Sequence, residues 1–259
     1  MPPKTAPSRQ DARARTIPQR HEHAGAGRDR SLSGGCWQLP GRHEDGETSV
    51  TEHHPLTQAQ WLNPPEESEI TSDAVHMVTT PNTDFWQRTF YGFQNTNAPA
   101  ALVEVDTNVT FSVRVQAQYQ RRYDQAGILV WIDVQNWFKA SVEYESQAGG
   151  RLGSVVTNHG QSDWATRDLG AVSDVWWRLS RRGPDFLLEA KTLDHWEQLR
   201  VFHLAALGPT DPAWGALAPD EIPASPVRLG VYACSPEDSS FSARFDHISL
   251  LPSAWTPHV

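Results

Sequence analysis

Apolar and polar side chains alternate along two segments of the chain, and this alternation constrains the fold more than any other feature. In residues 111–119 the odd-numbered positions are apolar or aromatic and the positions between them are polar. In residues 137–145 the even-numbered positions are apolar or aromatic. Successive side chains of a β-strand point to opposite faces, so this period predicts strands with one buried face. Both segments are therefore predicted to be strands that lie over a core.

Other parts of the chain have the same strand character. Residues 125–133, QAGILVWID, are apolar on both faces, which predicts a central strand that is covered on both sides. The Gly and Pro of residues 148–150 and 181–185 are typical of tight hairpin turns. No segment has a convincing helical period, so the pattern predicts an all-β sandwich. Further strands are predicted in residues 175–183, 186–193, 196–204, 227–234 and 241–251.

The N-terminal part of the chain differs in composition from the rest. Residues 1–49 contain no Val, Phe or Tyr, and such a segment cannot bury enough apolar surface to offset the entropy of ordering. We predict a disordered tail over residues 1–56, a β-sandwich domain over residues 57–252 and a C-terminal tail over residues 253–259. An alternative is that synthesis of the natural protein begins near Val50, where the composition changes.

Three segments outside the predicted strands bear on function. Histidines cluster at residues 21–23 and 53–54, but without a rigid frame they are expected to be solvated rather than to bind a metal. We therefore predict no metal site, and no cofactor. Residues 207–226 contain five prolines. Because proline is excluded from central strands, this segment is predicted to be a surface insertion and a candidate lid or rim.

Charge and composition argue against several classes of protein. The net charge of −9 disfavours a broad nucleic-acid-binding surface. No window approaches the roughly 18 apolar residues of a membrane span, and the N-terminus lacks the apolar stretch of a secretory signal. Cys36 and Cys234 are far apart in the sequence, which fits a reducing compartment better than a disulfide framework. We predict a cytoplasmic protein with neither a nucleic-acid nor a membrane partner.

Several blocks of sequence carry a resemblance to a known family. They are TDFWQRTFYGF (83–93), YDQAGILVWID with NWFKASVEYE (123–145), SVVTNHGQSDW (154–164), VWWRLSRRG (175–183) and YACSPEDSSFSARFDHISL (232–250). In their order and spacing they resemble the DUF1349 family of uncharacterised bacterial and fungal proteins, which is related by name to a yeast regulator of enolase. The resemblance covers roughly residues 57–250. It implies a concanavalin A-like jelly-roll of two antiparallel sheets with one concave face, but a fold alone assigns no activity.

The polar face of residues 137–145 is the main candidate for a ligand-binding site. Trp137, Lys139, Ser141 and Glu143 follow one another on this face at intervals of about 6.6 Å. An outward Trp beside charged groups suits a sugar, because the ring covers C–H groups and the charges hold hydroxyls. Alternatively, Lys139 and Glu143 belong to a solvated ion network without function. The full predicted set comprises Asp84, Trp86, Tyr91, Tyr123, Asp124, Gln125, Trp137, Lys139, Glu143, Asp163 and Trp164.

The aromatic run in residues 83–93 is interpreted in two parts. Phe85, Phe90 and Phe93 are predicted to fill the core. Trp86 and Tyr91 have polar groups as well as rings, so we predict that they form the lip of a cleft together with Asp84.

The predicted function is non-catalytic binding of a carbohydrate or a similar polar metabolite on the concave sheet. The first alternative is a regulatory protein–protein interaction module, as the enolase-linked family name implies. The second is a glycoside-processing enzyme that uses Glu143 and Glu145. Their backbone spacing of about 6.6 Å does not match the ~5 to 5.5 Å carboxyl separation of retaining enzymes. The chain also lacks a G-x-S-x-G elbow, a P-loop and an H-E-x-x-H motif, so no catalytic residue is predicted.

Overall fold

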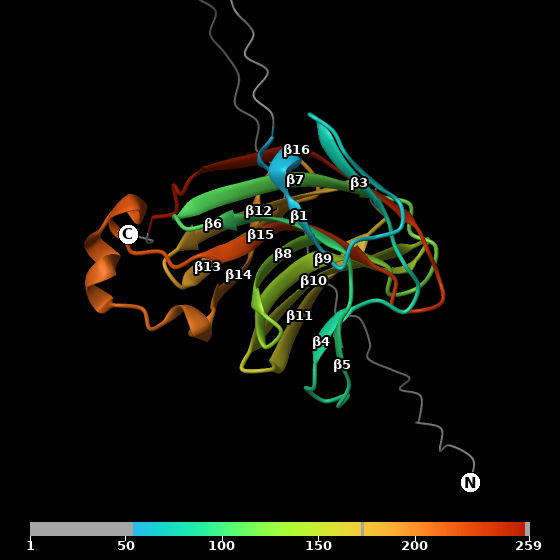
Figure 1. Cartoon of the computed structure of the whole chain (residues 1–259), viewed down its shortest axis with the longest axis horizontal. Coiled ribbons are helices and arrows are strands. Elements are labelled where there is room, and N and C mark those ends of the chain that lie inside the picture. The colour runs from blue at the N-terminus through green and yellow to red at the C-terminus, as the bar shows by residue number, and fades with distance from the viewer. Residues whose placement is uncertain (1–53, 172–173, 257–259) are drawn as a thin grey trace, which may run out of the picture. The chain divides into compact units, whose positions relative to one another are not determined.

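The computed structural model describes residues 54–171 and 174–256, which form an all-β sandwich (Figure 1). Sheet A, the first of two seven-stranded sheets, has the order β1-β6-β15-β8-β9-β10-β11. Neighbouring strands run antiparallel. The strands of sheet A are β1 (Gln60–Leu62), β6 (Ala100–Val105), β15 (Val227–Cys234), β8 (Gln125–Asp133), β9 (Asn136–Ser146), β10 (Gly149–Asn158) and β11 (Gln161–Gly170).

Sheet B is the second seven-stranded sheet, with the antiparallel order β14-β13-β12-β7-β16-β3-β2. A separate two-stranded hairpin joins β4 (Phe85–Gln87) to β5 (Gln94–Thr96). The predicted class, two antiparallel sheets in a sandwich, is confirmed. The strands of sheet B are β14 (Glu197–His203), β13 (Asp185–Lys191), β12 (Asp174–Arg182), β7 (Val109–Ala117), β16 (Ser242–Pro252), β3 (Ala74–Val78) and β2 (Ser68–Ile70).

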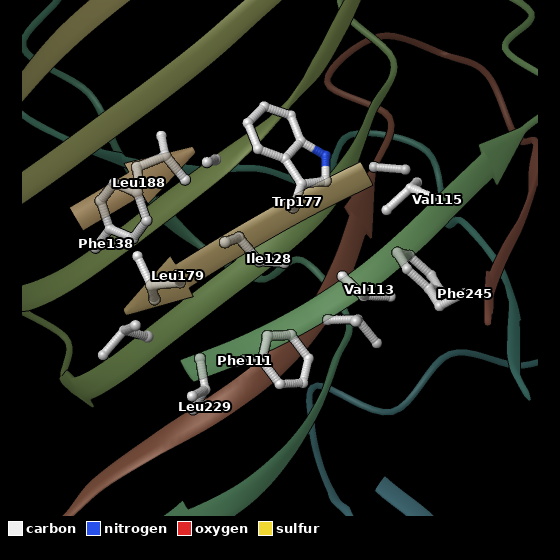
Figure 2. Close-up of a cluster of buried hydrophobic side chains, with 14 of the residues drawn as sticks. Phe111, Val113, Val115, Ile128, Phe138, Trp177, Leu179, Leu188, Leu229 and Phe245 are labelled. Atoms are coloured by element: carbon white, nitrogen blue, oxygen red, sulfur yellow. The ribbon is translucent and has the colours of Figure 1, made fainter. Parts of the chain in front are cut away.

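The main core lies between the two sheets and follows the predicted alternation. The odd-numbered apolar residues of β7 and the even-numbered ones of β9 are buried there. Strand β8 lies between β15 and β9 and is buried along most of its length, as its apolar character on both faces predicts. Figure 2 shows core side chains from both sheets, among them Phe111, Val113, Val115, Ile128, Phe138, Trp177, Leu179, Leu188, Leu229 and Phe245.

A second, smaller core lies on the outer face of sheet A. Phe85 of β4 is fully buried there and contacts three aromatic side chains of the sheet. Its ring centroid lies 5.7 Å from Trp131, 5.7 Å from Trp137 and 5.9 Å from Tyr232. Burying aromatic surface of this size is a large favourable term. The smaller core therefore fixes the β4–β5 hairpin over sheet A, and the candidate site lies beside it.

The N-terminal end of the described chain overlaps the predicted tail. The 3-10 turn η1 (Pro55–Gln58) places Leu56 in the main core with no exposed surface. Leu56, the last residue of the predicted tail 1–56, thus packs into the main core just before the first strand. The rest of that tail up to residue 53, including the 21–23 histidines, lies outside the described residues. No helix within residues 54–171 and 174–256 is long and apolar enough to cross a membrane.

The proline-rich insertion contains short 3-10 turns joined by irregular segments, at the end of the sandwich away from the β4–β5 hairpin (Figure 1). These are η2 (Ala205–Leu207), η3 (Pro212–Ala216) and η4 (Pro219–Glu221). Its carbonyl groups accept hydrogen bonds from buried side chains: Asn108 donates to Pro219 and Ile222, both at 2.7 Å. Arg182 donates to the carbonyl of Leu217 at 2.7 Å. These bonds satisfy backbone groups that irregular structure leaves free, so the insertion is fixed to sheet B.

Candidate ligand-binding site

A cavity of about 310 Å³ opens on the outer face of sheet A, next to the smaller core. Strands β8, β9, β10 and β11 supply its floor, and the β4–β5 hairpin supplies one wall. The residues just before β8 supply the opposite side. The volume lies within the usual range for small-molecule sites.

The floor of the cavity holds a buried polar network. Lys139 is 4% exposed, and its Nζ donates to Asp84 Oδ1 at 2.7 Å and to Gln125 Oε1 at 3.0 Å. Tyr232 donates from its hydroxyl to Ser141 Oγ at 2.9 Å, and also contacts Gln125 Oε1 at 3.2 Å. Alternation along β9 brings Lys139 and Ser141 to this face, and the hairpin brings Asp84 over them. The network joins three strands of sheet A to the hairpin.

The ion pair keeps Lys139 charged despite its burial. Burial alone lowers the pKa of Lys139, but the charge of Asp84 and its hydrogen bond outweigh this effect, so the pKa lies above its ordinary value. A fixed positive charge therefore lies beneath the cavity.

Glu143 is the exceptional group of the site. It is 8% exposed and lines the cavity, yet no group within residues 54–171 and 174–256 hydrogen-bonds to its carboxyl. Burial raises the pKa of Glu143 above the ordinary value of 4.5; the charge of Lys139 opposes this rise, while those of Asp84 and Glu145 add to it. The raised pKa means that the ionised form of Glu143 is less favourable in the folded protein than in the unfolded chain, chiefly because burial removes part of its hydration.

We expect Glu143→Gln to stabilise the protein at neutral pH. Because the folded-state pKa of Glu143 is raised, the wild type loses stability as pH rises from the ordinary value of 4.5 through the folded-state value. The glutamine variant has no such loss. We would measure the free energy of unfolding of both proteins by urea denaturation over a pH series. The two values should be similar at acidic pH and should differ increasingly toward neutral pH. A variant that is less stable than wild type at neutral pH would contradict this picture of Glu143.

The mouth of the cavity is aromatic on the hairpin side. Trp86, Tyr91 and Phe93 cluster there, with ring centroids 5.4 Å apart for Trp86–Tyr91 and 5.7 Å apart for the stacked Tyr91–Phe93 pair. Trp164 of β11, 39% exposed, also lines the cavity. Tyr91, Phe93 and Trp164 are exposed and can present ring faces to a ligand, whereas Trp86 is 7% exposed and belongs to the smaller core.

The opposite side of the mouth is charged. Glu145 accepts from Arg122 Nε at 2.6 Å and lies 3.4 Å from Arg151 Nε. The guanidinium of Arg122 lies 4.5 Å from the ring centroid of Tyr123. The two arginines therefore offset the charge of Glu145 and hold it at the rim.

Most of the predicted site residues meet in this cavity. Those that line it are Asp84, Trp86, Tyr91, Tyr123, Gln125, Lys139, Glu143 and Trp164. The sequence interpretation missed several other lining residues, among them Arg151. Arg151 lies opposite Glu143 in the β9–β10 register, which depends on the exact hairpin turn. Ser141 and Glu145 lie on the face of Lys139, as the alternation predicts, but they were not part of the predicted ligand-binding set.

Three predicted site residues do not line the cavity. Trp137 is on the predicted face of β9 but has no exposed surface, because Phe85 covers it. Asp124 is fully buried and accepts from Ser239 Oγ at 2.6 Å and from the backbone N–H of Arg121 at 2.8 Å. It therefore shapes the loop before β8. Asp163 points away from Trp164 and pairs with Arg200 of β14 at 2.7 Å.

Two other predictions about this region are wrong. Phe90 and Phe93 were expected in the core, but they are 93% and 46% exposed, because both lie at the tip of the β4–β5 hairpin. The insertion 207–226 contributes no residue to the cavity. It is held against sheet B by the Asn108 and Arg182 hydrogen bonds, so it is not a lid for this site.

Comparisons with known proteins agree with the fold and the family. The profile described as "Protein of unknown function (DUF1349)" matches residues 61–253. "Regulation of enolase protein 1" of Saccharomyces cerevisiae is 35% identical over 198 residues, which cover 75% of this chain and 90% of the relative. A crystal structure of a functionally unknown Saccharomyces cerevisiae protein is 32% identical with a TM-score of 0.64, and covers 79% of this chain and 99% of that one.

More distant structures share the fold alone. A xylan beta-1,4-xylosidase from Bacillus halodurans C-125 has a TM-score of 0.54 at 12% identity, covering 82% of this chain and 41% of the enzyme. The GH43 protein BlXynB from Bacillus licheniformis has a TM-score of 0.53 at 14% identity, covering 72% of this chain and 35% of that one. At such identities the likeness carries no function. The profile match and the yeast relative cover most of the sandwich, and the chain belongs to the DUF1349 family.

Proposed function

We propose that the cavity on sheet A binds a carbohydrate or a similar polar metabolite without catalysing a reaction. The observation that carries this proposal is Glu143, a carboxyl that is 8% exposed and has no hydrogen-bond partner among the described residues. Buried polar groups in proteins are normally satisfied. A ligand hydroxyl in the cavity would supply the missing partner.

The surroundings of Glu143 support a sugar-like ligand. Lys139 and Gln125 place polar groups on the floor of the cavity, and the exposed rings of Tyr91 and Trp164 line its mouth. A sugar has both C–H faces that pack on rings and hydroxyls that need directed partners. The cavity matches both requirements within a volume of about 310 Å³.

Tryptophan replacement on opposite sides of the sandwich tests this proposal. We expect a panel of neutral mono- and oligosaccharides to include at least one that changes tryptophan fluorescence. Trp164→Ala should weaken its binding by about tenfold, because a stacked ring contributes roughly 0.5 to 1.5 kcal/mol beyond its buried area. Trp196→Ala is the control, since Trp196 lies outside the cavity, against Arg178 at 4.3 Å from its ring centroid.

Three outcomes would contradict the proposal. The first is a panel in which no sugar binds. The second is an equal loss of binding in Trp164→Ala and Trp196→Ala. The third is hydrolysis of a bound oligosaccharide during the titration, which would replace the non-catalytic role by that of a glycoside-processing enzyme.

A regulatory protein–protein interaction is the second candidate function. It is favoured by the hairpin tip, where Phe90 is 93% exposed and Tyr91 53% exposed, and by the name of the yeast relative, which concerns regulation of enolase. Exposed clusters of large apolar residues often mark partner surfaces. If this candidate holds, purified enolase should be retained by the wild-type protein and lost with Phe90→Ala, while sugar binding is unchanged.

A further inference from the structure

The charged groups that line the cavity do not all have partners. Three carboxylates and three cations line it. Asp84 is paired with Lys139 at 2.7 Å, and Glu145 is paired with Arg122 at 2.6 Å and with Arg151 at 3.4 Å. Among the described lining residues, Glu143 is the one carboxylate without an ion pair or a hydrogen bond. The cavity therefore contains one carboxylate that is buried and available.

The positively charged side chains near Glu143 are held by other groups, so a cation of the ligand can pair with its carboxylate. Lys139 is held by Asp84 and Gln125. Arg151 lies opposite Glu143 in the strand register, but its Nε is directed to Glu145. Neither neighbouring cation makes contact with the Glu143 carboxyl within hydrogen-bonding or ion-pairing distance. A hydrogen bond from a charged donor is roughly twice as strong as one from a neutral hydroxyl, so an ammonium group would satisfy Glu143 better than a hydroxyl.

The aromatic mouth suits the same ligand. Trp86, Tyr91 and Phe93 form one continuous cluster beside the cavity. The faces of such rings attract cations as well as C–H groups. A ligand that joins a sugar ring to a positive charge uses both properties of the site.

We propose that the ligand of this cavity is an amino sugar, whose protonated amine pairs with Glu143 while its ring lies against the aromatic cluster. This inference rests on the proposed carbohydrate-binding function and narrows it. An ammonium group could equally come from a simple alkylamine, so the experiment separates these two sources.

Binding of an amino sugar should change the protonation of the Glu143 carboxyl. Lys139 and Arg151 favour its ionised form, whereas burial, Asp84 and Glu145 favour the protonated form, and the net effect raises the pKa of Glu143. An amine at the carboxyl stabilises the ionised form and lowers this pKa again. At mildly acidic pH, amino-sugar binding should therefore release protons, and the affinity should fall as Glu143 becomes protonated.

The test compares glucosamine, glucose, N-acetylglucosamine and ethanolamine as ligands of the full chain by calorimetry at neutral pH. We expect glucosamine to bind at least about tenfold more tightly than the two neutral sugars, as befits one charge-assisted hydrogen bond. Ethanolamine should bind more weakly than glucosamine. Repeating the glucosamine and glucose titrations in two buffers of different ionisation enthalpy at mildly acidic pH should reveal proton release for glucosamine alone.

Two variants make the test specific. Glu143→Gln should remove both the preference for glucosamine over glucose and the proton release, because an amide carries no negative charge and does not titrate. Glu104→Gln makes the same change of net charge at an exposed position of β6 outside the cavity, and should keep the preference.

The outcomes separate this inference from the proposed function. If glucose binds and glucosamine is no tighter, the inference is overturned and the proposed function stands. If ethanolamine binds as tightly as glucosamine, the amino sugar is overturned as the ligand class. If no sugar of a broad panel binds, the proposed function is overturned and the inference falls with it. A preference that survives in Glu143→Gln would also overturn the inference, since the carboxylate would not be its cause.

Discussion

Replacing Lys139 with methionine should lower the free energy of unfolding by about 3 to 5 kcal/mol, which is the usual cost of removing one partner from a buried ion pair. The side chains of Lys139 and Asp84 are only 5% and 14% exposed, and they meet at 2.7 Å. Methionine fills a similar volume but leaves the Asp84 carboxylate without its cation. Glu143 would also lose the nearby positive charge that partly offsets its burial. Urea denaturation at neutral pH measures the effect.

Two further variants separate the charge from the packing. The double variant Asp84→Asn Lys139→Met should recover a large part of the lost stability, because neither buried charge then remains unpaired. Lys191→Met is a control on sheet B, where Lys191 lies over the rings of Trp176 and Trp196 without an acidic partner within the described residues. Lys191→Met should lower the free energy of unfolding by less than about 1 kcal/mol. A double variant as unstable as Lys139→Met would show that packing, not charge, holds this part of the floor.

The strand periodicity predicted which way side chains point, but not what covers them. Trp137 lies on the same face as Lys139 and Glu143, as the alternation in β9 predicts. The interpretation that its ring was exposed is wrong because Phe85, far away in the sequence, lies over it. A period of two assigns residues to a face. Only the tertiary structure decides whether that face is open, and here Trp137 belongs to the smaller core while Lys139 and Glu143 line the cavity.

The composition of residues 83–93 could not separate core phenylalanines from exposed ones. Phe85 lies in β4, whereas Phe90 lies in the turn with a φ of 61°. This left-handed conformation is unfavourable for a bulky residue, so sequence patterns give little warning of it. The side chain of Phe90, in the turn, is exposed to solvent, whereas that of Phe85, in strand β4, is buried in the smaller core. Two identical residues in one aromatic run therefore have opposite environments.

The charge pairing of the site depends on contacts that no local pattern contains. Asp84 and Lys139 are separated by 55 positions in the sequence. They meet at the hairpin that Phe85 anchors on sheet A. The resemblance to the DUF1349 family predicted the sandwich, and the family is confirmed by the profile match over residues 61–253. It did not indicate that Glu143 would be the carboxylate left without a partner, because that follows from the pairing of every other charge around it.

Phe85→Ala should lower the free energy of unfolding by about 3 to 5 kcal/mol, the range for removing a fully buried aromatic ring. It should also abolish sugar binding. Phe85 has no exposed surface and contacts Trp131, Trp137 and Tyr232. Without its ring the β4–β5 hairpin loses its main anchor on sheet A. Asp84 and Trp86, its direct neighbours in the sequence, would then no longer be held at the cavity.

Phe90→Ala is the matched control, because it makes the same substitution in the same hairpin at a side chain that is 93% exposed. It should change stability by no more than about 0.5 kcal/mol and leave sugar binding intact. Because Phe85→Ala could act by unfolding the whole chain, Phe85→Leu is the third variant. Leucine keeps much of the apolar contact, so this variant should remain folded while its weaker anchoring of the hairpin reduces affinity. If Phe85→Leu bound sugar as tightly as the wild type while Phe90→Ala lost binding, the ligand would contact the exposed tip of the hairpin. The wall that Phe85 anchors would then have no part in the site.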